Sequence, residues 1–134
     1  MKERTKNMAF EFLRSENNAA PIEKEIIATN AVTYKHGCLV AFGSAGTAVT
    51  STANAEFVYT GKDTVAKTGD KLAVIPVLPE YEFETVFSAN GSSLKAGTKV
   101  TTDGEKATAT TASGIFQILA DGGASGTKIA GRFA

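Results

Sequence analysis

Residues 81–87 read YEFETVF, and this stretch decides the fold class of the chain. Its side chains alternate in character, so Tyr81, Phe83 and Phe87 fall on one face of an extended strand and the glutamates between them fall on the other. Burying two phenylalanines and most of a tyrosine is worth on the order of 5 kcal/mol of transfer free energy. The pattern predicts a strand whose aromatic face lies in the core.

Short strand-like segments continue on both sides of this stretch, with turn-forming residues between them. The predicted strands cover residues 22–28, 38–42, 56–60, 71–77, 81–87, 99–102, 105–110, 115–120 and 127–133. Beyond Pro21 no segment repeats its apolar residues at the 3.6-residue period of a helix. Many short strands at this spacing predict an all-β domain over residues 21–134, either a sandwich or a barrel.

Two similar segments could bind phosphate or could form turns. They are AKTGDKLAV at residues 66–74 and LKAGTKVTT at residues 94–102. A phosphate-binding loop requires a second glycine and a following helix, whereas strand-like residues follow both segments. The pattern therefore favours tight turns that lead into strands, with Gly69 and Gly97 at positive φ.

Two further features indicate changes of chain direction around the central strand. Asp103-Gly104 lies between two threonine-rich runs and predicts a type I′ hairpin turn. Upstream, the segment VIPVLPEY carries Pro76 and Pro79 just before the aromatic strand, and it predicts a corner between two strands.

The first twenty residues differ from the rest of the chain. They carry charges, amides and a small apolar cluster of Met8, Phe10, Phe12 and Leu13. This cluster fits one face of a helix as well as one face of a strand, and SENNAAP interrupts the chain after it. We interpret residues 1–20 as an arm outside the core; the alternative is a terminal helix packed on the domain.

Length and charge narrow the class of protein. A chain of 134 residues with no net charge predicts one domain with no general attraction to nucleic acid or to acidic membranes. The N-terminus has no apolar stretch typical of a signal peptide, and no apolar run is long enough to span a bilayer. We expect a soluble protein that is made in the cytoplasm.

Candidate catalytic and metal-binding residues are few. His36 and Cys38 are separated by a turn-forming glycine, and a cysteine nucleophile needs a histidine that meets it and a third group that orients the pair. Glu80, Glu82 and Glu84 share a strand face, but nothing around them has the spacing of a calcium loop. We therefore expect no enzyme activity, no metal site and no cofactor, and we interpret Cys38 as a small buried apolar residue.

A family resemblance rests on four segments and on the polar N-terminal arm. The segments are KTGDKLAVIPVLPEYEFET, SLKAGTKVTTDGEKATAT, GIFQIL and GTKIAGRF. Over roughly residues 30–134, the chain resembles the capsid decoration (cement) proteins of tailed bacteriophages. The resemblance implies a small β-barrel or β-tulip-like domain with an extended N-terminal arm. It implies a homotrimer on the outside of the virion's capsid, without enzyme activity, nucleic acid or membrane. The major capsid protein would be the partner, with Met8, Phe10, Phe12 and Leu13 as the anchors of the arm.

Three alternatives stay open from the sequence. The chain could be another phage structural subunit, such as a tail-tube or head–tail joining protein. It could be a surface carbohydrate-binding β module, although it has no tryptophan to stack on a sugar. An enzyme would require His36 to meet acidic residues in a pocket.

Overall fold

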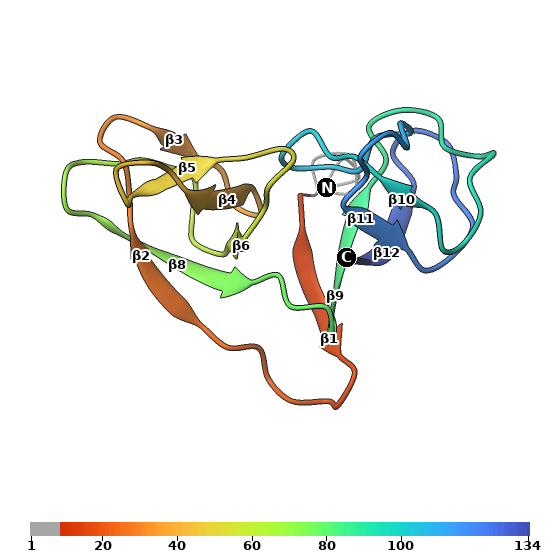
Figure 1. The fold of residues 1–134 in the computed structure, drawn as a ribbon, viewed down its shortest axis with the longest axis horizontal. Coiled ribbons are helices and arrows are strands. Elements are labelled where there is room, and N and C mark those ends of the chain that lie inside the picture. The colour runs from red at the N-terminus through yellow and green to blue at the C-terminus, as the bar shows by residue number, and fades with distance from the viewer. Residues whose placement is uncertain (1–8) are drawn as a thin grey trace.

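The computed structural model describes residues 9–134, which form strands in three antiparallel sheets and no helix (Figure 1). The predicted all-β class is confirmed. The strands are β1 (Glu11–Ser15), β2 (Lys24–Ile27), β3 (Thr33–Tyr34), β4 (Leu39–Phe42), β5 (Ala48–Thr50), β6 (Phe57–Tyr59), β7 (Thr64–Val65), β8 (Lys71–Pro76), β9 (Tyr81–Val86), β10 (Lys99–Val100), β11 (Phe116–Ile118) and β12 (Lys128–Phe133). Sheet A has the order β1-β9-β12-β11-β10, sheet B has the order β2-β8-β6-β4-β5, and β3 pairs with β7.

All but the last residue of the stretch YEFETVF form β9, and its aromatic residues lie in the core as predicted. Tyr81, Phe83 and Phe87 are 4%, 0% and 1% exposed. On the same face of sheet A, Phe116 and Phe133 lie with their ring centroids 5.2 Å apart, which is a favourable distance for an aromatic pair. This aromatic face is the centre of the larger of the two cores.

The centre of sheet B is buried on both faces, whereas its edge strands β2 and β5 carry exposed residues. Leu39, Val58 and Ile75 point toward sheet A and join its aromatic core. Val40 and Val74 point the other way, into a second core that Tyr34 of β3 helps to cover. A strand that is buried on both faces has no polar side to display, and this explains the uninterrupted apolar residues of β4 and β6.

The expected barrel is only partly realised. Sheet B curls until Ala28, just after β2, forms an isolated bridge with Ala48 of its opposite edge strand β5. This single bridge does not extend into a ladder within the described residues, and the two sheets of five strands remain separate. The architecture is therefore two five-stranded sheets packed together, of which sheet B is curled, and not a closed barrel.

The proline segment forms the predicted corner, and it is the point at which the chain leaves sheet B for sheet A. It joins β8 to β9 and passes between the two halves of the molecule (Figure 1). The Val77 N–H donates to the Glu56 carbonyl at 3.1 Å, and the Tyr81 N–H donates to the Leu78 carbonyl at 3.0 Å. After the earlier passage from β1 to β2, this short, hydrogen-bonded turn is therefore the chain's return from sheet B to sheet A.

Two predictions for the segment after β10 are wrong. Residues 105–110 form no strand, because only Ala107 pairs there, through isolated bridges to Phe87 and Thr102. The turn is not a type I′ turn centred on Asp103-Gly104, since that turn needs positive φ at both residues and only Gly104, at 97°, has it. Instead, the Asp103 N–H donates to the Lys106 carbonyl at 3.0 Å, so Gly104 and Glu105 form the centre.

The separation of an N-terminal arm from the domain is also wrong for residues 9–15. Strand β1 is one of the two edge strands of sheet A, where Phe12 lies opposite Phe83 and Arg14 lies opposite Glu82. The core begins earlier still, because Phe10 is 1% exposed. The sequence-based boundary at residue 20 therefore places a core strand outside the domain.

Candidate functional site

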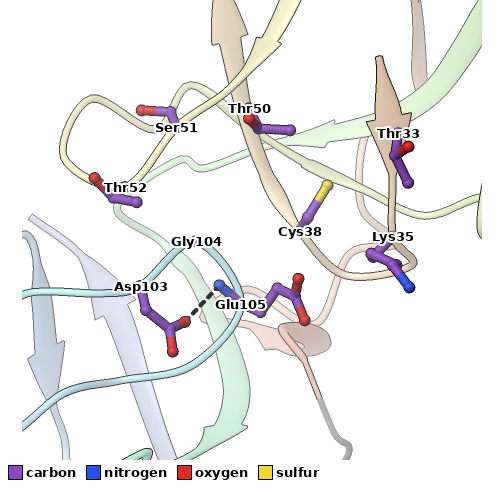
Figure 2. A pocket seen from close by; sticks show the side chains of 9 residues that line it. All are labelled: Thr33, Lys35, Cys38, Thr50, Ser51, Thr52, Asp103, Gly104 and Glu105. Atoms are coloured by element: carbon purple, nitrogen blue, oxygen red, sulfur yellow. Dashed lines mark hydrogen bonds between the residues drawn. The ribbon is translucent and has the colours of Figure 1, made fainter. Parts of the chain in front are cut away.

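An open pocket of about 430 Å³ lies where the two sheets meet (Figure 2). One wall comes from the segments around β3, β4 and β5, and it includes Lys35, Cys38 and Thr52. The facing wall is the turn that carries Asp103 and Glu105. The volume is within the range of small-ligand sites in proteins, about 300–1,000 Å³.

Hydrogen bonds from the backbone and from short side chains fix the turn against sheet B and so define the pocket. The Leu39 N–H donates to the Gly104 carbonyl at 2.8 Å. The Thr102 hydroxyl donates to the Thr52 carbonyl at the same distance. Within the turn, the Asp103 carboxylate accepts from the Glu105 N–H at 3.0 Å, the bond drawn in Figure 2. The wall is therefore held by the backbone and by the Thr102 and Asp103 side chains, and none of these bonds uses the Glu105 side chain.

The pocket offers hydrogen-bonding groups but no activated nucleophile. Burial raises the pKa of Cys38 to about 11, so its thiol stays protonated at neutral pH. The ring nitrogens of His36 face the Gly61 carbonyl and the Glu11 carboxylate, and neither faces the thiol. Within residues 9–134, no three His, Cys, Asp or Glu side chains are grouped to hold a metal ion. These observations support the interpretation of Cys38 as a small buried apolar residue.

His36 belongs instead to a cluster that joins the N-terminal strand to sheet B. Its Nδ1 lies 2.9 Å from the Gly61 carbonyl oxygen, and its Nε2 lies 2.9 Å from Oε2 of Glu11. The His36 backbone N–H donates to the Asp63 carboxylate at 2.8 Å. Desolvation lowers the pKa of His36, but the Gly61 carbonyl and the charge of Glu11 outweigh it and raise the pKa above 6.5.

The residues predicted to anchor a capsid-binding arm lie in or beside the aromatic core. Phe10 packs edge-on against Phe116 at a centroid distance of 5.2 Å, and Phe12 packs edge-on against Tyr81 at 5.3 Å. Leu13 is half-buried and sits at the irregular step in the pairing of β1 with β9. Met8 lies outside the described residues. In this conformation Phe10 and Phe12 stabilise the domain, and Phe10 has no surface left for a partner.

The acidic residues of β9 do not act together as a cation site. Glu82 forms an ion pair with Arg14 of the neighbouring strand. Glu84 lies opposite Glu11 on one side and Ala130 on the other. Since Glu11 in turn contacts His36, this face of sheet A is a mixed surface in which two of the carboxylates have cationic or hydrogen-bonding partners.

Both lysine–glycine segments are turns that lead into strands, as predicted. The Asp70 N–H donates to the Lys67 carbonyl at 3.0 Å, directly before β8. The Thr98 N–H donates to the Lys95 carbonyl at 3.1 Å, directly before β10. The third residue of each turn is a glycine at positive φ, 88° for Gly69 and 94° for Gly97, as type II turns require.

Replacing Gly69 or Gly97 by valine should lower the free energy of unfolding by about 1 kcal/mol or more, because a β-branched residue is strained at positive φ. A side chain would have room, since an added Cβ meets nothing within 4 Å at either position. Urea unfolding checks this, with asparagine at the same positions as the milder control. Unchanged stability combined with loss of phosphate binding would restore the phosphate-site interpretation.

Sequence reasoning could not find the pocket or the His36 cluster. Glu11 and His36 are 25 residues apart in sequence, and Thr52 and Thr102 are 50 apart.

No helix in the described residues is long and apolar enough to cross a membrane. Comparison of the sequence with protein-family models and with curated proteins gives no match.

Proposed function

We propose that this protein is a structural virion protein that binds the outer surface of a tailed-phage capsid and stabilises it. The observation that supports this is where the segments of the resemblance lie in the fold. YEFET, GIFQIL and KIAGRF supply β9, β11 and β12, which are consecutive in sheet A, and LKAGTKV supplies its edge strand β10. These four segments therefore lie together in sheet A around the aromatic core, while KTGDKLAVIPVLP supplies β8 of sheet B.

The physical setting of a capsid suits such a domain. A shell repeats one binding site many times, so a homotrimer would gain avidity from several weak contacts at once. The chain has no net charge, and neighbouring copies on a crowded shell would therefore not repel one another strongly. The major capsid protein is the partner in this proposal, and the surface of the folded domain makes the contact.

Binding to purified capsids tests the proposal. We expect saturable co-sedimentation with expanded, empty heads of the phage that encodes the chain, and a higher temperature of capsid disruption once the sites are filled. Unexpanded heads are the control, because binding to the expanded lattice should be stronger. Light scattering on the free protein should give the mass of a trimer.

Other outcomes would favour the alternatives. Failure to saturate expanded heads contradicts the proposal. Rings or tubes of the free protein in negative stain would indicate a tail-tube or joining subunit instead. Specific signals on a glycan array, without capsid binding, would indicate a carbohydrate-binding module.

A further inference from the structure

The His36 ring is placed between two oxygen atoms that can only accept hydrogen bonds. One is the Gly61 carbonyl oxygen, and the other belongs to the Glu11 carboxylate, each at 2.9 Å from a ring nitrogen. A neutral imidazole carries one N–H, so it can satisfy only one of the two. An imidazolium donates to both and also neutralises the carboxylate. The geometry therefore selects the protonated ring.

The loop that carries His36 also holds the residues before β1, through a backbone hydrogen bond. The Phe10 N–H donates to the Gly37 carbonyl at 3.1 Å. Gly37 lies so close to this segment that a Cβ added to it would be 2.6 Å from the Cβ of Ala9. Because the Gly37 N–H donates to the Tyr59 carbonyl at 2.8 Å, and the Asp63 carboxylate accepts from the His36 backbone N–H, the loop itself is fixed to β6 of sheet B and to the segment before β7. Residues 36 and 37 thus clamp β1 at its first residues.

We propose that protonated His36 is a latch that closes the N-terminal segment, residues 9–15 with strand β1, onto the domain, and that loss of its proton loosens this segment locally. The charged groups around the ring are Glu11 from the strand itself and the pair of Asp63 and Lys35, whose charged atoms are 3.8 Å apart. Only Glu11 lies on the strand that moves, so the proton couples to the position of β1. This inference is independent of the proposed capsid function.

The direction of the pH effect follows from the raised pKa of His36 in the folded protein. Its contribution to closure is fully present below the unfolded value of 6.5 and is lost as pH rises through the higher folded value. His36 is the only histidine of the chain. The burial of Phe10 is untouched by this proton, so deprotonation should raise local opening of β1 without unfolding the domain.

Hydrogen exchange followed by NMR tests the latch. We expect the protection factor of the Phe10 amide, corrected for the intrinsic pH dependence of exchange, to fall about two- to fivefold between about pH 6 and pH 8.5. The Tyr59 amide, which donates to Cys38 inside sheet B, is the internal control and should not change. The ring protons of His36 should titrate above 6.5 with the same midpoint.

His36→Gln is the matched variant, because the glutamine amide keeps N–H donors but does not titrate. It should remove the pH dependence of Phe10 protection, and any titration of the chain's amino terminus is common to both proteins. Glu11→Gln should lower the His36 midpoint and weaken the effect. The latch is contradicted if Phe10 protection is independent of pH in the native sequence, or if it falls equally in His36→Gln.

Discussion

Replacing Phe10 by alanine should lower the free energy of unfolding by about 3–5 kcal/mol, the usual cost of truncating a buried aromatic residue. Phe10 is 1% exposed, and its ring centroid lies 5.2 Å from that of Phe116 and 5.3 Å from that of Phe133. Truncation leaves a cavity that these two rings cannot fill without leaving their own packing. Urea or guanidinium unfolding, followed by circular dichroism, measures the loss.

Ile22→Ala is the control for this prediction, because Ile22 is 49% exposed and its truncation should change stability by less than about 0.5 kcal/mol. A loss below about 1 kcal/mol for Phe10→Ala would mean that the N-terminal segment is detached in solution, as the arm interpretation supposes.

The same reasoning applies to deletion of residues 2–20. An arm outside the core could be removed without harm, whereas the structure predicts that this deletion prevents stable folding.

Replacing Gly37 by alanine should lower the free energy of unfolding by about 3 kcal/mol or more, because backbone strain and overpacking each contribute about 1–3 kcal/mol. Gly37 has a φ of 82°, which alanine adopts only with strain. Its new methyl group would also lie 2.6 Å from the Cβ of Ala9 and 2.8 Å from the Phe10 carbonyl oxygen. Neither atom is at the end of a flexible side chain, so the strand would have to shift.

Gly46→Ala separates the two contributions. Gly46 has nearly the same φ, 80°, but an added Cβ there meets nothing within 4 Å. The Gly46→Ala variant should lose only the cost of the strain, about 1 kcal/mol of the free energy of unfolding. The two variants should therefore differ by about 2 kcal/mol in denaturant unfolding. Equal losses in the two variants would show that the N-terminal segment does not press on Gly37 in solution.

Patterns confined to a few neighbouring residues predicted the fold well. The alternation of YEFETVF identified β9 and its buried face, and the glycines of the two lysine-flanked turns have the predicted positive φ. The prolines before Tyr81 identified the corner between the sheets. Each of these features depends on local backbone geometry, which a short stretch of sequence determines.

Features that depend on distant residues were not predictable in the same way. The apolar pattern of residues 8–13 fits a helix or a strand equally, and only pairing with β9, some seventy positions later, makes it a strand. Arg14 and Glu82, whose side chains form a hydrogen bond in that pairing, are 68 residues apart in the sequence. The Glu11–His36 contact and the pocket arise only after both sheets have assembled. Barrel closure also depends on how far a sheet curls, which a list of strands does not specify.

The order of the strands along the chain has a consequence for synthesis from the N-terminus. Every strand of sheet B lies between Lys24 and Pro76, so its parts are all present before β9 has been made. Sheet A takes its first strand from residues 11–15 and its central strand β12 from residues 128–133. Phe10 must therefore wait for Phe116 and Phe133, which come from β11 and β12, before it can be buried. A nascent chain carries this exposed side chain throughout its elongation, and contacts of such long sequence separation are slow to form.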